Sequence, residues 1–269
     1  MNLTLGALLA RLPLEPLENR ILLGHALGLS RVALITESQR ELTSEEVARV
    51  EALVARRVAG EPVAYIVGTR EFYGLPFQVS PAVLIPRPET EHLVELALER
   101  MPPRARVLDM GTGSGAIAVA LAHTRPDAQV TALDRSPEAL AVARANAAAN
   151  GTPVRFLQSD WFSALADDER FDVIASNPPY VAAGDPHLAQ GDLRFEPTGA
   201  LTDEADGMQA LRTIAAGAPA HLAPGGWLLM EHGYDQGAAV RQLLQRDFDQ
   251  VQSWRDLAGI ERVTGGRLR

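Results

Sequence analysis

VLDMGTGSG, residues 107–115, joins a short apolar run to a glycine-rich turn. Such a run ending in glycines predicts a buried strand followed by a tight turn, and the alanine-rich segment after it predicts a helix to about His123. Gly111, Gly113 and Ala116 also match the relaxed fingerprint G-x-G-x-x-A, in which helix N–H groups face a bound ligand. Turns of this kind also occur as simple packing, so the motif by itself does not establish a ligand.

The segments around this turn alternate between strand and helix patterns, which favours an α/β fold. The predicted strands cover residues 106–110, 129–134, 154–158, 171–176, 227–230, 249–254 and 260–264. Helices are predicted from about 89 to 100 and over 116–123, 137–150, 207–222 and 236–246. Asp134 ends the second strand, about twenty residues after the turn, where a carboxylate can accept both hydroxyls of an adenosine ribose. This order of elements, in which a strand, a glycine turn, a helix and a second strand lead to the Asp134 carboxylate, indicates a cofactor that contains adenosine.

Two more acidic residues lie at the ends of predicted strands. Asp109 could orient the glycine turn or meet a cationic group of the ligand, and Asp160 could accept a hydrogen bond from an adenine amino group. A solvated or capping role explains either residue without any ligand.

Asn177-Pro178-Pro179-Tyr180 follows the apolar run 171–176. The prolines turn the backbone rigidly and leave carbonyls that can accept hydrogen bonds. Asn177 adds an amide oxygen and Tyr180 adds a flat ring, so the four residues would form an acceptor cradle for a planar –NH2 group. An ordinary strand-ending Asn-Pro turn explains the tetrapeptide equally well.

Residues 1–70 carry helix patterns and few chemical groups. Leu5, Leu8 and Leu12 are spaced for one helix face, and a capping box at 43–46 precedes another apolar repeat. This segment predicts a small helical bundle that binds substrate or acts as a lid. His25 lies on an apolar face, and we expect it to be a packed core residue rather than a ligand.

Residues 71–88 predict a linker β-hairpin, with strands at 71–79 and 82–85. Prolines flank Arg87 and hold it in an extended segment, from which it could be aimed at a site. A solvated linker arginine accounts for Arg87 as well.

Composition narrows the class of protein. The chain has 269 residues, of which 46% are hydrophobic, as in a globular protein with a core. It lacks cysteine and lysine, which excludes disulfides, thiol catalysis, lysine catalysis and a Walker-type phosphate loop. A net charge of -9 disfavours broad binding to a phosphate backbone. No apolar run approaches the roughly 20 residues of a membrane helix, and the start lacks a signal-peptide pattern, so we expect a cytoplasmic protein.

The candidate ligand sites favour one enzyme class. A dehydrogenase would use the same glycine turn, but nothing here supplies its proton-transfer residue. A dinucleotide also needs pyrophosphate contacts and normally a second mononucleotide half. An acceptor site for –NH2 at the end of the fourth strand is what an N-methyltransferase requires.

Taken in order, DMGTGSG at 109–115, Asp134 and Asn177-Pro178-Pro179-Tyr180 resemble the class I S-adenosylmethionine-dependent methyltransferases. The tetrapeptide is shared by DNA adenine-N6 and protein glutamine-N5 enzymes. Four other stretches resemble the PrmC/HemK family, the release factor glutamine methyltransferases: RPETE at 87–91, EPTGAL at 196–201, EHG at 231–233 and DLAG at 256–259. The similarity covers nearly the whole chain.

The resemblance implies a Rossmann-like fold with a seven-stranded, mostly parallel sheet whose last strand is antiparallel, plus a small N-terminal helical bundle. It divides the chain into a substrate-recognition domain (1–70), a linker hairpin (71–88) and a catalytic domain that binds S-adenosylmethionine (89–269). The implied reaction methylates N5 of the glutamine in the Gly-Gly-Gln motif of peptide chain release factors 1 and 2. The products would be N5-methylglutamine and S-adenosylhomocysteine. We expect a monomer that uses no metal, contacts no membrane and does not act on nucleic acid.

Two alternatives remain beside this interpretation. One is an adenine-N6 methyltransferase that acts on DNA or RNA, against which the acidic charge counts. The other is a binding module that holds S-adenosylmethionine as a sensor, against which the intact –NH2 cradle counts.

The resemblance also assigns site residues. The catalytic set is Asn177, Pro178, Pro179 and Tyr180. The cofactor set is Asp109, Gly111, Thr112, Gly113, Gly115, Asp134, Asp160, Trp161 and Asn177. The substrate set is Asn177, Pro178, Tyr180, Arg87 and Glu196. In this site the Asn177 oxygen and the Pro178 carbonyl accept the two N–H groups of the substrate amide, and Tyr180 packs on the amide plane.

Overall fold

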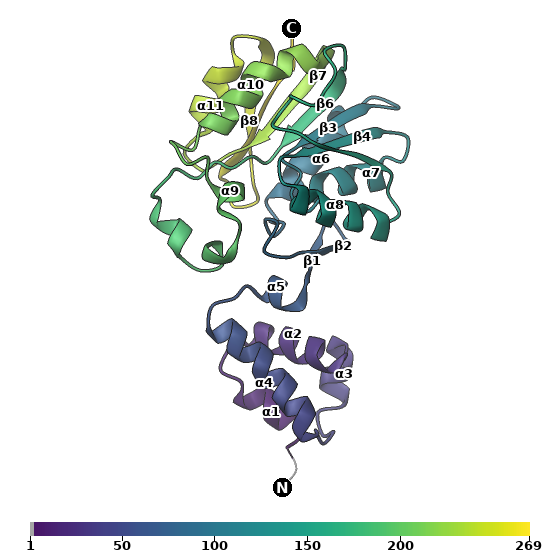
Figure 1. The fold of residues 1–269 in the computed structure, drawn as a ribbon, viewed down its shortest axis with the longest axis vertical. Helices are drawn as coiled ribbons and strands as arrows, with labels where there is room; N and C mark the ends of the chain where they lie inside the picture. The colour runs from purple at the N-terminus through teal and green to yellow at the C-terminus, as the bar shows by residue number, and fades with distance from the viewer. Residues whose placement is uncertain (1–2) are drawn as a thin grey trace. The chain divides into compact units, whose positions relative to one another are not determined.

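The computed structural model describes residues 3–269. The chain divides into two compact units, Met1–Thr69 and Arg70–Arg269. Figure 1 follows the chain from the helical first unit to the α/β second unit. Over the described residues, no helix is both long enough and apolar enough to span a bilayer.

The first unit is helical, as the sequence predicts. Its helices are α1 (Leu5–Arg11), α2 (Pro16–Leu27), α3 (Arg31–Thr36), α4 (Ser44–Val58) and α5 (Val63–Val67). The predicted capping box starts α4: the Thr43 hydroxyl accepts from Glu46 N, and the Glu46 carboxylate accepts from Thr43 N. Leucine and valine side chains from α1, α2 and α4 form the buried core of this unit.

Two details of this unit differ from the sequence prediction. α3 is not predicted from the sequence, because its six residues are too few to show a helical repeat. Its start is marked only by Ser30, whose hydroxyl accepts from Ala33 N. His25 is exposed rather than packed, since the neighbouring Leu22 and Leu23 fill the core side of α2.

A hairpin of β1 (Thr69–Phe72) and β2 (Leu75–Gln78) spans the boundary, since the second unit begins at Arg70. Tyr73 and Gly74 form its turn with φ angles of 52° and 74°. Positive φ at both central positions matches the right-handed twist of the two strands. The predicted single strand at 71–79 is therefore wrong: the turn at Tyr73-Gly74 divides it, and both strands of the observed hairpin lie at or before Gln78.

The predicted strand at 82–85 is wrong, because these residues adopt no strand structure. Pro81 and Pro86 flank the segment and have no N–H to donate to a ladder. Residues 82–84 instead line the cavity described below.

A seven-stranded sheet forms the centre of the second unit, which confirms the predicted fold class. Its strands are β3 (Arg106–Met110), β4 (Gln129–Asp134), β5 (Val154–Gln158), β6 (Phe171–Ser176), β7 (Leu222–Glu231), β8 (Phe248–Arg255) and β9 (Glu261–Leu268). The spatial order is β5-β4-β3-β6-β7-β9-β8. The last strand, β9, pairs antiparallel with both β7 and β8, whereas β3 to β7 pair in parallel. The chain order reverses between β3 and β6, and open α/β sheets bind ligands at such a switch point.

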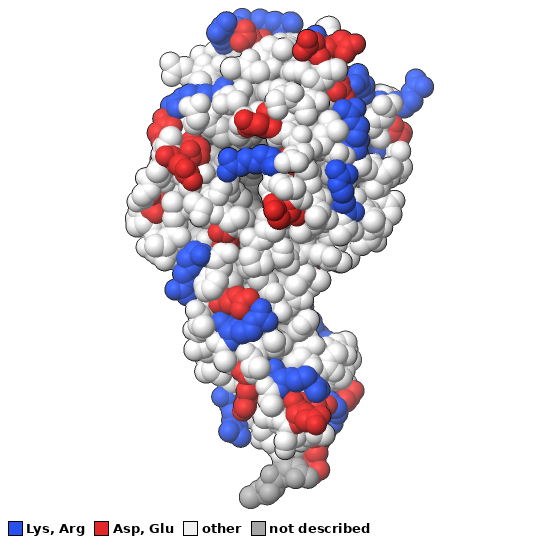
Figure 2. Space-filling view, viewed as in Figure 1, with Lys and Arg blue, Asp and Glu red and all other residues white. Residues whose placement is uncertain are grey.

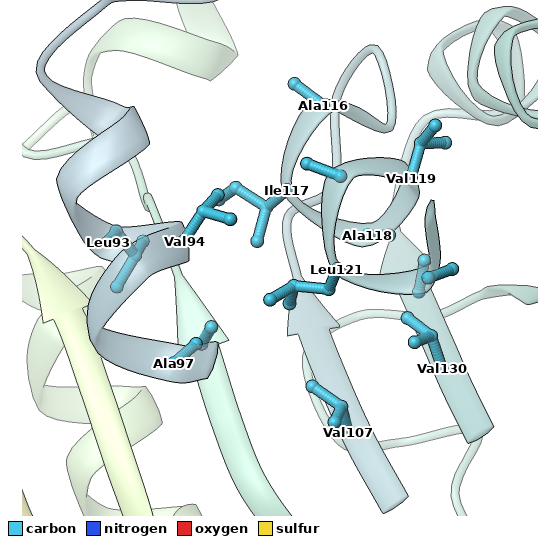
Figure 3. Packing of buried hydrophobic residues seen from close by; sticks show 14 of the residues in the cluster. Leu93, Val94, Ala97, Val107, Ala116, Ile117, Ala118, Val119, Leu121 and Val130 are labelled. Carbon is cyan, nitrogen blue, oxygen red and sulfur yellow. The ribbon is translucent and has the colours of Figure 1, made fainter. Parts of the chain in front are cut away.

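Helices cover both faces of this sheet (Figure 1). On one face, α6 (Thr90–Arg100), α7 (Ala116–Thr124) and α8 (Pro137–Ala149) share a core with Val107, as Figure 3 shows for α6 and α7. On the other face, α10 (Gln209–His221) and α11 (Gly237–Leu244) share a core with Leu108. Since neighbouring residues of β3 enter different cores, the strand is buried on both sides, as parallel strands usually are.

A long connection joins β6 to α10. It contains η1 (Pro186–Ala189), η2 (Leu193–Phe195) and the short helix α9 (Thr198–Leu201). Residues 197–204 of this connection border the same cavity as the strand ends.

Candidate active site

The carboxyl ends of β3, β4, β5 and β6 border a cavity of about 540 Å³, called the edge cavity here. Of the predicted site residues, seven line it: Gly111, Gly113, Asp134, Asp160, Trp161, Asn177 and Pro179. Its other walls come from 82–84 and from the connection before α10. The strands therefore bring together residues separated by more than sixty positions in the chain.

Gly111 and Gly113 keep one wall of the edge cavity open. Their φ angles are 71° and 56°, in the left-handed region that favours glycine. A β-carbon on either residue would meet no atom within 4 Å, because it would project into free space. A ligand can thus approach this backbone closely.

Gly115 serves packing instead. It has a φ of 84°, and a β-carbon there would lie 3.1 Å from the Ala143 side chain on α8. The glycine therefore lets α7 begin close against α8. Asn146, buried on the same helix, donates to the Ser114 carbonyl at 2.8 Å and fixes the turn from behind.

Asp134 is held at the rim of the edge cavity by backbone amides. One carboxylate oxygen accepts from Gly113 N at 2.9 Å, and the other accepts from Ser136 N at 2.9 Å. Each oxygen keeps a further lone pair that can accept from a ligand hydroxyl. The two amides pre-position this carboxylate before any ligand binds.

Asp109 is fully buried and does not line the edge cavity. Its Oδ2 accepts from the Thr112 hydroxyl at 2.6 Å and from Ala118 N at 3.2 Å. Burial raises the pKa of Asp109 to about 7, against the lowering effect of these two hydrogen bonds. Of the two roles considered from the sequence, this geometry supports the one in which Asp109 orients the glycine turn.

Asp160 and Trp161 follow β5 at the far side of the edge cavity. The Asp160 side chain is exposed. Trp161 has a φ of 50°, and its carbonyl accepts from the Ser159 hydroxyl at 2.6 Å. This turn presents a carboxylate and an indole to the cavity, next to Asp134.

Asn177 directly follows β6, the strand that pairs with β3. Its Nδ2 donates to the Thr90 hydroxyl oxygen at 3.1 Å, and Thr90 is the first residue of α6. Within residues 3–269, neither the Asn177 side-chain oxygen nor the Pro178 carbonyl accepts a hydrogen bond from the chain. Asn177 and Pro179 line the edge cavity, whereas Pro178 is buried.

Tyr180 directs its hydroxyl to β7 rather than to the edge cavity. Its oxygen lies 3.4 Å from Oε1 of Glu231, to which it donates a long hydrogen bond. Burial, followed by the charge of Glu231, raises the pKa of the Tyr180 hydroxyl, which therefore stays protonated. Stacking of its ring on a substrate amide stays a prediction.

Glu231 is 1% exposed, and its Oε2 has no hydrogen-bond partner among the described residues. Burial raises the pKa of Glu231 to about 7, while hydrogen bonding by Thr90 and Tyr180 lowers it. Thr90 thus lies near the carboxylate, although its hydroxyl makes no well-aligned hydrogen bond to either oxygen of Glu231 within the described residues. Asn177 bonds to Thr90, Tyr180 bonds to Glu231, and we call these four neighbouring polar residues the amide-side chain.

Arg87 and Glu196 contact each other rather than the edge cavity. The Arg87 guanidinium pairs with Oε1 of Glu196, and Oε2 of Glu196 accepts from Ile85 N at 3.1 Å. Burial raises the pKa of Glu196, and Arg87 opposes that shift. The pair fastens the segment before α6 to the connection before α10. Direct contact of either residue with substrate stays a prediction.

Sequence reasoning missed several residues of the site. Thr90 and Glu231 lie within the RPETE and EHG stretches, but only their contacts with Asn177 and Tyr180 reveal a role. Val83 and Leu84 fall in the predicted strand and instead line the edge cavity. Their position between Pro81 and Pro86 was the available signal against a strand.

The edge cavity fits the cofactor that the sequence predicts. Gly111 and Gly113 leave open space where side chains would stand, and Asp134 offers free lone pairs beside them. Trp161 and Leu133 add apolar surface for a flat ring system. These features suit the adenosine part of S-adenosylmethionine.

Two family models match this chain. The model for the PrmC N-terminal domain matches residues 6–68, and the model for the methyltransferase small domain matches residues 89–192. Among solved structures, a T. thermophilus 16S rRNA N2 G1207 methyltransferase aligns with a TM-score of 0.57 and 24% identity. It covers 75% of this chain and 50% of that one. A Pyrococcus furiosus methyltransferase aligns with a TM-score of 0.56 and 19% identity, over 80% and 96% of the two chains. At this identity, both show the shared fold alone.

Curated relatives are much more similar. The release factor glutamine methyltransferase of Burkholderia pseudomallei is 59% identical over 274 residues, which span 98% of this chain and 96% of the relative. The enzyme of the same name from Escherichia coli is 48% identical, over 93% of this chain and 91% of the relative. Because these relatives are 48–59% identical over more than nine tenths of both chains, the chain belongs to the release factor glutamine methyltransferase family.

Proposed function

We propose that the edge cavity is where this enzyme transfers the methyl group of S-adenosylmethionine to N5 of a release factor glutamine. The observation that carries the assignment is the state of Asn177. Its –NH2 group donates to Thr90, and its oxygen, which lines the cavity beside an open glycine turn, accepts no hydrogen bond from the described residues. An acceptor and a cofactor wall that share one cavity are what N-methylation of an amide needs.

On the cofactor wall, Asp134 would accept the ribose hydroxyls while Gly111 and Gly113 allow close approach. Asp160 and Trp161 would border the adenine. Asp109, Thr112 and Gly115 would act indirectly, because they shape the turn and the start of α7. When bound, S-adenosylmethionine supplies an electrophilic methyl group.

The chain's own residues must activate a poor nucleophile. An amide nitrogen is weakly nucleophilic because its lone pair is delocalised into the carbonyl. The Asn177 oxygen and the Pro178 carbonyl would accept its two N–H groups and hold the nitrogen in line. As the nitrogen becomes positive, both acceptors bind it more strongly, so they stabilise the transition state more than the ground state. No general base is required before transfer, because the product nitrogen loses its proton readily.

We further propose release factors 1 and 2 as the protein substrates, with the glutamine of their Gly-Gly-Gln motif as the acceptor. The proposed domains are a recognition domain at 1–70, a linker at 71–88 and the catalytic domain at 89–269. We also propose that the protein is a cytoplasmic monomer and that it uses no metal ion. A truncated chain that starts at residue 70, where the second unit begins, should bind S-adenosylhomocysteine but lose turnover on an intact release factor. Undiminished turnover would refute the recognition role of the helical unit.

A nucleic-acid substrate receives little support. The net charge is -9, and on the face in Figure 2 arginines are interspersed with acidic residues. Broad contact with phosphates requires clustered positive charge.

One competition experiment tests the proposed function. The enzyme is incubated with cofactor labelled in the methyl group, one purified release factor and a DNA duplex. Label should appear in the release factor as N5-methylglutamine, and a release factor whose Gly-Gly-Gln glutamine is replaced by alanine should stay unlabelled. Label in the duplex, or equal label in the alanine variant, would contradict the proposal.

A further inference from the structure

The amide-side chain includes two buried residues to which the proposed chemistry assigns no role. Thr90 is 4% exposed and Glu231 is 1% exposed. Thr90 comes from the first turn of α6 and Glu231 from the end of β7, and Thr90 accepts from the Asn177 amide. Buried polar groups without a full set of partners are costly, so their retention next to a reaction site calls for a function.

The direction of the hydrogen bonds is fixed by the chemistry of these groups. An ionised carboxylate only accepts, so Glu231 accepts from the Tyr180 hydroxyl and can take the Thr90 proton, but it cannot donate to either residue. Among the described residues, nothing accepts the Thr90 hydroxyl proton with good hydrogen-bond geometry, and the nearby Glu231 carboxylate, whose Oε2 also lacks a partner, is the group that could take it. Once that proton points to Glu231, Thr90 offers only lone pairs to its other neighbour.

This direction decides which end of the Asn177 amide faces substrate. Thr90 can then only accept, so the –NH2 end of Asn177 must face it, at 3.1 Å. The oxygen end is left facing the edge cavity. With the amide reversed, two oxygens would face each other at Thr90, and an N–H donor would meet the substrate –NH2.

We propose that Thr90 and Glu231 are positioning residues that fix the orientation of the Asn177 amide, so that its oxygen faces the substrate nitrogen. Neither residue touches substrate in this account. The inference rests on the proposed function, because it concerns the residue that would bind the substrate amide. It extends that function by naming two side chains that act through Asn177.

The test is a set of substitutions that change hydrogen bonding more than shape. Thr90→Val removes the hydroxyl, Thr90→Ser restores it, and Glu231→Gln replaces the carboxylate with a group that can also donate. Thr131→Val makes the same change at another buried threonine, on β4, as a matched control. Single-turnover methylation of a release factor at saturating cofactor gives the transfer rate, and calorimetry gives the affinity for S-adenosylhomocysteine.

We expect Thr90→Val to slow transfer by about 10- to 100-fold, since misplacement of a reacting contact by 1 Å costs about 100-fold. Thr90→Ser should recover most of the rate, and Thr131→Val should leave it near the wild-type value. Cofactor affinity should stay within about two-fold in all four variants. A Thr90→Val rate within two-fold of the wild type, or no recovery with serine, would overturn the inference.

A double-substitution cycle separates positioning from general packing. If Thr90 acts through Asn177, Thr90→Val should have no further effect once Asn177→Ala is present. If the double variant instead loses rate by the product of the two single fold-losses, Thr90 has an independent structural role and the inference is refuted. If Asn177→Ala itself retains the wild-type rate, the proposed site fails. If Asn177→Ala is slow while Thr90→Val transfers at the wild-type rate, the proposed site stands and only the positioning role of Thr90 and Glu231 fails.

The pH profile gives an independent readout. Tyr180 after β6, Arg262 on β9, and Glu89 and Thr90 at the start of α6 face the Glu231 carboxylate. Because burial raises the pKa of Glu231 to about 7, the transfer rate should rise with pH through neutrality as the carboxylate ionises. Asp109 also has a pKa raised to about 7, so the comparison is with Glu231→Gln. That variant should lose part of the rise, and an unchanged profile would count against the inference.

Discussion

The two walls of the edge cavity are built in different ways. The cofactor wall consists of Gly111, Gly113, Asp134, Asp160 and Trp161, each at or just after the end of a strand. Its hydrogen bonds come from backbone amides, as Ser136 N and Gly113 N donate to Asp134 from 2 and 21 positions away. The amide-side chain instead joins residues 51 and 87 positions apart. The first wall is held by backbone amides at neighbouring strand ends, and the second by contacts between side chains that are far apart in the sequence.

This difference decides how each wall should respond to substitution. Residues of the cofactor wall should change cofactor affinity and leave the chemical step nearly intact. Residues of the amide-side chain should do the reverse. Substitutions on each wall can therefore test whether the two functions are separable.

Asn177→Asp should produce the largest change that still preserves side-chain shape. A carboxylate would attract the developing positive charge, but it would repel the substrate carbonyl and lose the –NH2 that Thr90 binds. We expect the second effect to dominate, with transfer slowed by about 100-fold or more. Single-turnover methylation at saturating cofactor measures the rate. A variant faster than the wild type would show that charge at this position outweighs orientation.

Asp134→Ala should weaken the affinity for S-adenosylhomocysteine by about 2–3 kcal/mol, because two ribose donors would lose a charged acceptor. Calorimetry measures this loss. Saturating cofactor should restore a transfer rate near that of the wild type, since the amide-side chain is untouched. Unchanged affinity would remove Asp134 from the cofactor site. A rate that stays low at saturation would show that the two walls are coupled.

The smallest expected effect concerns stability at the amide-side chain. The folded pKa of Glu231 is about 7, above its ordinary value of 4.5, so between these values the folded state holds a proton that the unfolded state has released. Stability must therefore fall as pH rises through this window. Relative to Glu231→Gln, the wild type should lose about 1 kcal/mol of unfolding free energy from pH 6 to pH 7.

Urea unfolding of both proteins at the two pH values measures this loss. Asp109 titrates in the same range in both proteins, so its contribution cancels in the difference. A difference that does not vary with pH would show that Glu231 is not a buried acid that ionises near neutrality.

The contrast between the walls also explains what sequence could predict. The order of strands and helices from β3 to β6 follows from apolar runs, caps and glycines, which are local signals. The positions of Gly111, Gly113, Asp134 and Asn177 at the sheet edge follow from that order, because parallel strands end at one edge. Periodicity and turn chemistry therefore locate the residues that border the edge cavity.

Partners across the sheet could not be predicted in this way. Nothing near Thr90 in the sequence indicates that its hydroxyl accepts from Asn177. Arg87 could be placed in an extended segment, but its pairing with Glu196 depends on the path of the connection before α10. The strand expected at 82–85 fails because its apolar residues cover a cavity and do not pair in a sheet. In each case a tertiary contact supplies the information that a local pattern lacks.

Asn177→Ala tests the central claim most directly, because it removes the acceptor and leaves the prolines to set the turn. Single-turnover methylation of a release factor, with cofactor affinity measured on the same preparation, gives both quantities that the claim separates. We predict transfer slower by about 100- to 1,000-fold, as for the loss of one transition-state hydrogen bond, with affinity for S-adenosylhomocysteine nearly unchanged. Transfer at more than about a tenth of the wild-type rate would contradict the claim that Asn177 holds the reacting amide.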